Sequence, residues 1–208
     1  MKICEIFHSL QGEGKNIGLP TIFLRTTGCN LRCDWCDTRY AWDEGEEMKV
    51  KEVKKAIDDF DCNRICITGG EPLLNEDIYK LIDILTTDYS ISVETNGSLD
   101  ISKLKEKNVM ISMDYKTPSS SMEDKMNEKN LALLKETDQL KFVIFDEKDY
   151  NFSKRVLREN NIQSEIIFQP VEGKEMEEIA DAVIEDNLEV RVLPQLHKII
   201  WDDETRGV

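Results

Sequence analysis

Short apolar segments alternate with helical or polar segments along most of this 208-residue chain. Seven of the apolar segments have the length and composition of buried strands, and turn residues follow most of them. These predicted strands cover residues 21–25, 65–68, 91–94, 109–113, 140–145, 165–168 and 190–193. Strands that alternate with helices in this way predict a parallel sheet with right-handed crossovers.

The length of the chain limits how far such a sheet can close. An eight-stranded βα barrel usually takes about 250 residues, and this chain has 208. We therefore expect an α/β fold with an incomplete, TIM-like βα barrel. No linker or low-complexity segment interrupts the pattern, which predicts a single domain over residues 1–208. Helices are expected near residues 50–60, 76–85, 101–107, 131–134, 152–160 and 176–185, with a first strand at 3–7, a turn-rich loop at 8–14 and a mobile polar loop at 119–129.

The charge balance restricts the partners of the chain. It has 27 basic and 42 acidic residues, a net charge of -15. An extended nucleic-acid interface or an anionic membrane surface requires clustered Lys and Arg, so neither is expected, although a small anionic ligand needs only one or two cations. No segment is apolar and long enough for a signal peptide or a membrane span, which predicts a cytoplasmic protein. Cysteines in that compartment are metal ligands or thiols more often than disulfides, and we expect Cys4, Cys62 and Cys66 to be buried free thiols.

The remaining three cysteines form one cluster directly after the predicted strand at 21–25. Cys29, Cys33 and Cys36 have the spacing C-x3-C-x2-C. Three thiolates on one loop can bind three irons of a [4Fe-4S] cube and leave the fourth iron without a protein ligand. A structural zinc site normally has four ligands, and no fourth ligand stands at finger-like spacing. A zinc knuckle or unrelated thiols are the alternatives to an iron-sulfur site.

Other unusual segments follow the predicted strands. In parallel α/β folds, ligands bind at the carboxyl ends of the strands, where these segments should meet. They comprise the cysteine loop and residues 68–72, 94–97, 114–118, 169–170 and 193–197. Loops and turn residues are common at such edges, which explains scattered Gly and Pro. It does not explain a cysteine triplet at the same edge.

The cysteine spacing and its flanks resemble the radical S-adenosylmethionine (SAM) superfamily. Residues 69–72, Gly-Gly-Glu-Pro, resemble the GGEP motif of the same superfamily and follow a predicted strand. The resemblance implies that the open iron binds SAM, which an electron from the cluster cleaves to methionine and a 5'-deoxyadenosyl radical. Glycine lets the backbone approach a ligand closely, and the Glu71 carboxylate is suited to accept a hydrogen bond from the ammonium of SAM.

Both ends of the chain resemble the 7-carboxy-7-deazaguanine synthase (QueE) family. The segments that carry this resemblance are residues 9–14, 36–38, 191–197, Trp201 and 206–208. The family implies a radical ring contraction of 6-carboxy-5,6,7,8-tetrahydropterin to 7-carboxy-7-deazaguanine, with release of ammonia, in 7-deazapurine (queuosine or archaeosine) biosynthesis. In this reaction the radical abstracts hydrogen from C6 of the substrate, and SAM is regenerated at the end of the cycle.

The resemblance also implies cofactor contacts. The positions that correspond to SAM contacts are Trp35, Cys36, Asp37, Gly70, Glu71, Asp114, Tyr115 and Lys116. Thr38 corresponds to the Mg²⁺ ligand of the family, although in isolation it is an ordinary turn residue. Many relatives have Ser-Pro-Lys where this chain has Asp114-Tyr115-Lys116. The lysine is retained, but the resemblance does not fix the backbone pose of the triplet.

The residues near the two ends suit a carboxypterin. A pterin presents a 2-amino-4-oxo pyrimidine edge, which requires acceptors beside its N–H groups, while its carboxylate suits a guanidinium. The candidate substrate contacts are Leu10, Gln11, Gly12, Glu13, Arg25, Thr68 and His197. The structural alternatives are a surface ion pair for Arg25, a tight turn at 11–14 and a capping role for His197. His8 is a weaker candidate, and Trp201 is expected to pack rather than react.

Several partners follow from the same resemblance: a small-molecule substrate, an electron donor such as flavodoxin or ferredoxin, and a second copy of the chain in a homodimer. Two other functions fit part of the sequence. A glycyl-radical-activating enzyme acts on a protein and has no use for the acceptors at 11–13. A non-catalytic zinc or iron-sulfur module has no use for the Gly-Gly-Glu-Pro segment.

Overall fold

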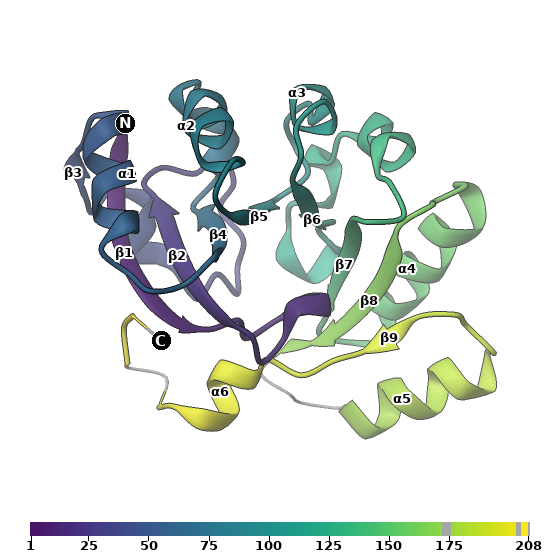
Figure 1. Ribbon diagram of the computed structural model, residues 1–208. Helices are drawn as coiled ribbons and strands as arrows, with labels where there is room; N and C mark the ends of the chain where they lie inside the picture. Colours follow the sequence, from purple (N-terminus) through teal and green to yellow (C-terminus); the bar gives the residue numbers. More distant parts are fainter. Residues whose placement is uncertain (172–175, 203–204, 208) are drawn as a thin grey trace.

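A computed structural model describes residues 1–171, 176–202 and 205–207, and Val208 of the C-terminal motif lies outside them. Nine strands form one sheet in the order β3-β1-β2-β4-β5-β6-β7-β8-β9 (Figure 1). Their bounds are β1 Lys2–Leu10, β2 Pro20–Thr26, β3 Glu46–Glu47, β4 Arg64–Gly69, β5 Ser90–Thr95, β6 Met110–Asp114, β7 Gln139–Ile144, β8 Glu165–Pro170 and β9 Arg191–Val192. The sheet is parallel from β2 through β9, which confirms the predicted α/β fold, and β1 is antiparallel to both of its neighbours.

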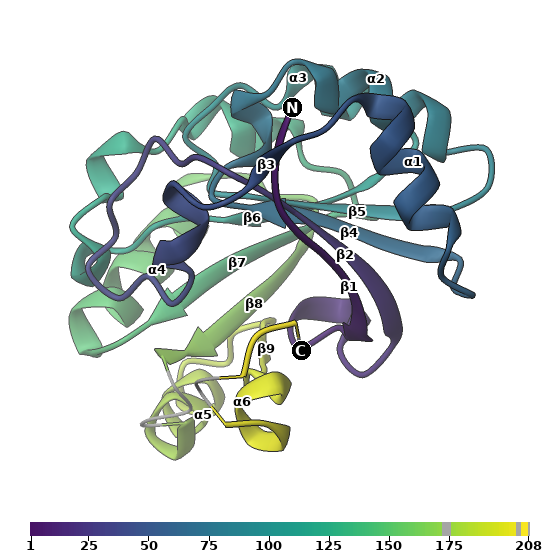
Figure 2. The same cartoon turned by 90° about the vertical axis from the view of Figure 1, so that its left-hand side faces the viewer.

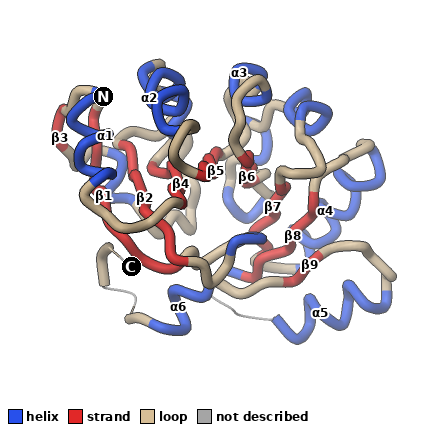
Figure 3. Tube along the Cα trace, viewed as in Figure 1, coloured by secondary structure: helices blue, strands red, loops and turns tan. Residues whose placement is uncertain are grey.

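The sheet curves into an open barrel whose outer side is covered by helices (Figures 1 and 3). The helices are α1 Val50–Asp58, α2 Asp77–Leu85, α3 Ser102–Lys105, α4 Glu147–Glu159, α5 Met176–Glu185 and α6 Leu196–Ile200. The sheet does not close between β1 and β9, so the predicted incomplete barrel is confirmed. No described helix is both long and apolar enough to cross a membrane.

The two faces of the parallel strands have different surroundings. In β7, Leu140 and Phe142 belong to the hydrophobic core, while Lys141 and Val143 line a cavity inside the barrel. In β4, Ile65 packs in the core and Cys66 lines the cavity. Successive side chains of a strand point to opposite faces. The same strands therefore build the core outside and a ligand cavity inside.

The first strand is longer than predicted and changes where the following loop lies. The segment expected to be a loop from residue 8 continues in β1 as far as Leu10, which pairs with Pro20 at the start of β2. Because β1 is antiparallel, the loop at 11–15 lies at the amino ends of the parallel strands. There the Lys15 backbone N–H donates to Gln139 Oε1 at 2.8 Å. The loop closes the amino end of the barrel and forms the floor of the cavity.

The C-terminal segment bridges the open side of the barrel. The Leu196 backbone N–H donates to the Gly12 carbonyl at 2.8 Å. Gly12 faces the imidazole of His197 so closely that a Cβ at this position would lie 2.2 Å from Nδ1. Figure 2 shows α6 and the C-terminus beside β1. The two ends of the chain thus meet across the gap between β1 and β9.

Some local predictions were wrong. The helix expected at 131–134 is a 3-10 segment, Glu128–Leu133, and the polar loop before it contains 3-10 turns at Pro118–Ser120 and Glu123–Lys125. α4 begins at Glu147, because the Asp146 side chain accepts a hydrogen bond from the Asp149 backbone and caps the helix.

The three cysteines outside the loop differ in burial. Cys66 is buried as predicted, whereas Cys4 and Cys62 are only partly buried. Cys4 lies within β1, and Cys62 lies just before β4.

A stability prediction concerns Asn130, which is fully buried. Its amide donates to the Gly97 and Leu99 carbonyls at 3.0 and 2.7 Å and accepts from the Ile101 backbone N–H at 3.3 Å. Asn130→Ala leaves these backbone groups unpaired, and we expect a loss of about 1–3 kcal/mol in the free energy of unfolding measured by urea denaturation. The exposed Asn151 of α4 provides the control, since Asn151→Ala should change the value by less than about 0.5 kcal/mol. Equal effects of the two substitutions would contradict the assigned role.

Candidate active site

A cavity of about 860 Å³ lies inside the open barrel. Its walls come from the loops at the carboxyl ends of the strands, its floor from the loop at 11–15, and its open side from α6 and the C-terminal residues. The predicted site residues that line it are Leu10, Gln11, Gly12, Glu13, Arg25, Cys29, Cys33, Trp35, Cys36, Asp37, Thr38, Thr68, Gly70, Asp114, Lys116 and His197. Glu71 and Tyr115 are not among the lining residues.

The cysteine loop is fixed to the sheet by backbone hydrogen bonds. The Gly28 N–H donates to the Ala41 carbonyl at 2.8 Å, and the Glu71 N–H donates to the Gly28 carbonyl at 2.8 Å. Two donors point at the Cys29 sulfur: the Leu31 backbone N–H at 3.4 Å and the Asn96 amide at 3.8 Å. Such donors stabilise a thiolate. The loop is therefore held in place with its sulfurs facing the cavity.

The chemistry of the three thiols fits an iron-sulfur cluster. Burial raises the pKa of Cys29 and raises that of Cys33 to about 11, so metal binding here must displace protons. Within residues 1–171, 176–202 and 205–207, no three Cys, His, Asp or Glu side chains converge on one point as ligands of a single ion. In a [4Fe-4S] cube each thiolate binds a different iron. Separated sulfurs around one cavity are compatible with that arrangement.

The Gly-Gly-Glu-Pro segment packs directly against the cysteine loop. A Cβ on Gly70 would lie 2.1 Å from the Gly28 carbonyl oxygen and 2.9 Å from Cys29 Cβ. Only a glycine permits this approach. The segment thereby fixes the position of the first cysteine.

Glu71 differs from its predicted role. Its side chain is 1% exposed and accepts hydrogen bonds from the Leu73 N–H, the Thr95 hydroxyl and the Asn96 N–H at 3.1, 2.9 and 2.7 Å. These bonds engage both oxygens of the carboxylate, which does not line the cavity. Glu71 therefore holds the loop after β5, which carries the Asn96 donor, rather than facing a ligand.

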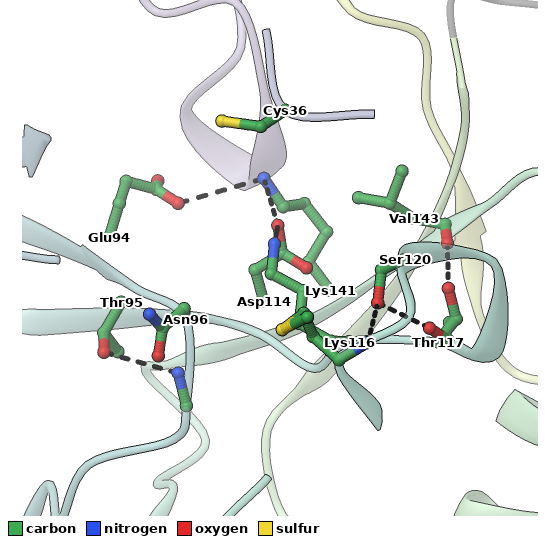
Figure 4. A network of polar contacts seen from close by, with 12 residues as sticks. Cys36, Glu94, Thr95, Asn96, Asp114, Lys116, Thr117, Ser120, Lys141 and Val143 are labelled. Carbon is green, nitrogen blue, oxygen red and sulfur yellow. Dashed lines mark hydrogen bonds and ion pairs between the residues drawn. The ribbon is translucent and has the colours of Figure 1, made fainter. Parts of the chain in front are cut away.

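Of the triplet at 114–116, the two charged residues face the cavity. Lys116 Nζ lies 2.9 Å from Asp114 Oδ2 (Figure 4) and 4.9 Å from the centre of the Trp35 ring. Tyr115 instead packs in the core against Phe142, with ring centroids 5.7 Å apart. Its predicted contact with SAM does not agree with this position.

A group of charged side chains lies deeper in the cavity around Lys141. Its ammonium is paired with Glu13. It also lies 3.9 Å from Asp114 Oδ2 and 4.0 Å from Glu94 Oε2 (Figure 4). Burial alone would lower the pKa of Lys141, but Glu13, Asp114 and Glu94 outweigh it and raise the pKa. Burial likewise favours a neutral Glu13, but Lys141 and His197 hold the pKa of that carboxyl far below its usual range. Glu13 and Lys141 are thus both charged.

Sequence reasoning missed three residues of this group: Lys141, Glu94 and Gln195. The Gln195 amide donates to Glu13 Oε1 at 2.7 Å. Only for Lys141 did the sequence contain a signal. Lys141 interrupts the apolar strand Gln139–Ile144, and a strand covered on both faces rarely carries an isolated charge without a partner. No comparable signal distinguishes Gln195 in its segment.

Arg25 lies in the upper wall of the cavity. Its Nε donates to Glu5 Oε1 at 2.6 Å, and its guanidinium lies 5.8 and 5.9 Å from the Phe7 and Tyr40 ring centres. Thr68 is its neighbour in the sheet. The ion pair weighed as an alternative for Arg25 does exist, but it occurs within the cavity wall and occupies only Nε among the described residues.

The remaining predicted residues are found near the same cavity, except for His8. Thr38 Oγ1 is 3.9 Å from Cys36 Sγ. Trp201 also lines the cavity, as does His197. His8 is exposed and lies outside the cavity, with its ring centroid 6.1 Å from that of Phe60.

Comparisons with known proteins agree with this geometry. The model of the radical SAM superfamily matches residues 23–137. The 7-carboxy-7-deazaguanine synthase of Thermoplasma acidophilum is 38% identical over 205 residues, 98% of each chain, and that of Methanospirillum hungatei is 40% identical over 202 residues, 96% of this chain and 85% of the other. The chain belongs to the 7-carboxy-7-deazaguanine synthase family. The crystal structure of QueE from Escherichia coli matches the fold with a TM-score of 0.78 at 24% identity, over 94% of both chains.

Membership of the radical SAM superfamily makes a [4Fe-4S] cluster and SAM the cofactors of this chain. The superfamily match ends before β7 and starts after the floor loop. Lys141, Gln195, His197 and the residues at 11–13 therefore lie in the parts that the chain shares with the synthases but not with the superfamily model.

The contact between Gly70 and the cysteine loop generates a test. Gly70→Ala should displace Cys29 because the added methyl group overlaps the Gly28 carbonyl and Cys29 Cβ. We expect the variant to retain less than about half of the wild-type iron after anaerobic reconstitution, measured by iron analysis and the visible spectrum of the cluster. Gly18→Ala is the control: a Cβ there meets nothing within 4 Å, so the substitution tests the backbone strain of an alanine at φ +84° without any overlap. Full iron content in Gly70→Ala would contradict the packing argument.

Proposed function

We propose that this chain is a radical SAM lyase that converts 6-carboxy-5,6,7,8-tetrahydropterin to 7-carboxy-7-deazaguanine and ammonia in 7-deazapurine biosynthesis. The observation that carries the proposal is that one cavity joins the three loop cysteines to a floor of heterocycle acceptors. Full-length similarity to synthases of that name supports it. The loop at 11–15 closes the floor, so the cavity suits a small molecule better than the protein substrate of a glycyl-radical-activating enzyme.

The upper wall of the cavity is suited to the cofactors. Cys29, Cys33 and Cys36 would hold the cluster, which together with SAM supplies one-electron radical chemistry. The backbone at Gly70 and the Trp35 ring border the same region. Asp114 Oδ1 is buried and has no hydrogen-bond partner among the described residues, so it is available to a donor of a bound ligand.

The lower part is suited to the substrate. Gln11 and Glu13 would accept hydrogen bonds from the pyrimidine edge, and the free Nη groups of Arg25 would bind the substrate carboxylate in a bidentate manner. Thr68 adds a hydroxyl beside Arg25, and His197 covers the floor loop.

We further propose that Thr38 is a ligand of Mg²⁺. Thr38 lines the cavity with its hydroxyl 3.9 Å from Cys36 Sγ. Mg²⁺ commonly combines a few protein oxygens with water and substrate oxygens. A flavodoxin or ferredoxin as electron donor, a homodimer and a cytoplasmic location belong to the same proposal. Reduction of the cluster by each purified donor and sedimentation of the reconstituted protein test the first two, and a lack of reduction or a monomer would remove them.

An anaerobic assay tests the reaction itself. The reconstituted protein is incubated with reductant, SAM, Mg²⁺ and 6-carboxytetrahydropterin, and 7-carboxy-7-deazaguanine is measured by mass spectrometry. We expect the product together with ammonia. SAM cleavage without this product would reject the substrate, and an absence of SAM cleavage would reject the enzyme class. Omission of Mg²⁺ should slow product formation, and an unchanged rate would reject the role of Thr38.

Arg25→Ala should separate substrate binding from SAM chemistry. Removal of the guanidinium leaves the substrate carboxylate without its cation, so we expect kcat/KM to fall by about 100-fold. Slow, uncoupled SAM cleavage without substrate should persist because, among the described residues, Arg25 forms its hydrogen bond and ion pair with Glu5 and none with the three loop cysteines. Arg25→Lys is the matched variant and should recover only part of the loss, since an ammonium cannot bind in a bidentate manner. If Arg25→Ala loses both activities equally, Arg25 is structural.

A further inference from the structure

The Glu13 carboxylate is held from two directions by residues of distant segments. Oε2 is paired with the Lys141 ammonium of β7, and Oε1 accepts a hydrogen bond from Gln195 Nε2 at 2.7 Å. The side chain of Glu13 is 19% exposed and lines the cavity. Each carboxylate oxygen has two acceptor positions. One on each oxygen is therefore used by the protein, and the other two remain for a ligand.

Lys141 is unfavourable for the stability of the fold taken alone, because burial removes its ammonium from water. Its side chain is 6% exposed and its strand neighbours Leu140 and Phe142 belong to the core. A buried ammonium is tolerated only where carboxylates compensate its desolvation. Glu13, Asp114 and Glu94 do so here, and without the cation their mutual repulsion and burial would favour a protonated Glu13. Lys141 thus keeps Glu13 ionised and prevents its rotation.

A fixed carboxylate with one free acceptor position on each oxygen matches two adjacent N–H donors in a plane. The ring N–H and the exocyclic amino group of a 2-amino-4-oxopyrimidine form such a pair. A protonated carboxyl offers a donor at one of these positions and cannot accept both hydrogen bonds.

On this basis, and resting on the proposed function, we propose that Lys141 and Gln195 are positioning residues that set the enzyme's specificity for the 2-amino group of its substrate. Neither touches the reacting carbon in this assignment. They act through Glu13 by fixing its charge and orientation. A substrate without the 2-amino group would leave one of the two free acceptor positions of Glu13 unfilled, which a site built for hydrogen bonding rejects.

The test compares 6-carboxytetrahydropterin with its 2-desamino analogue. For the wild-type holoenzyme we expect kcat/KM to favour the natural substrate by at least about 100-fold. In Lys141→Met the natural substrate should lose most of this advantage, chiefly through KM, while the analogue changes little, so that the ratio falls to within about tenfold. Gln195→Met should give an intermediate ratio. Dissociation constants of both compounds, measured by anaerobic calorimetry with SAM present, should follow the same order.

Lys154→Met is the matched control, since Lys154 forms an ion pair with Asp186 but does not line the cavity. It should keep the wild-type ratio. Unchanged ratios in both Lys141→Met and Gln195→Met would overturn the inference, and so would an equal loss for both compounds, which indicates a structural role. If Lys141→Met does not fold, as judged by circular dichroism, Gln195→Met decides alone. Failure of the wild type to convert the carboxypterin would instead reject the proposed function, together with the inference that rests on it.

Discussion

The interior of this barrel depends on the ion pairs that the buried ammonium of Lys141 forms with its neighbouring carboxylates. Three carboxylates reach it from β5, β6 and the floor loop. Any of them would be costly in this position without a cation, because burial disfavours the charged form. A single lysine therefore allows one small cavity to contain several acids, and it links the floor loop to the strands that carry the cofactor side of the site. A hydrophobic residue at this position would simplify the core but remove the charge from Glu13.

The alternation of side chains between the two faces of each strand explains how one sheet provides both stability and chemistry. The parallel strands direct alternate side chains into the helix-covered core and into the cavity, as Phe142 and Lys141 illustrate. A shift of one residue would reverse the two sets. The dense outer core fixes the register, and the register fixes which polar groups face the ligand. The packing in the outer layer is thus a condition for the geometry of the inner one.

The sequence predicted the parts of the site that depend on local spacing. The cysteine triplet, Gly70 and the loops after the strands required only short patterns. It did not predict the direction of side chains within those loops: Glu71 is turned inward by three donors, and Tyr115 packs in the core between two residues that face the cavity. The position of the loop at 11–15 could not be predicted either. It depends on the antiparallel pairing of β1 with β2, and local periodicity does not predict which strands pair or in which direction.

The meeting of the chain ends explains why both of them resemble one specific family. An open barrel leaves a gap between its first and last strands, and here the Gly12–Leu196 hydrogen bond and the Glu13–Gln195 contact cross it. The superfamily model covers the segments from β2 to β6, which carry the cysteine loop and the Gly-Gly-Glu-Pro segment. Selection of a substrate requires groups that face the radical from the opposite side. In an incomplete barrel part of this side consists of the two ends of the chain, which is why the proposed substrate contacts at residues 10–13 and at His197 lie there.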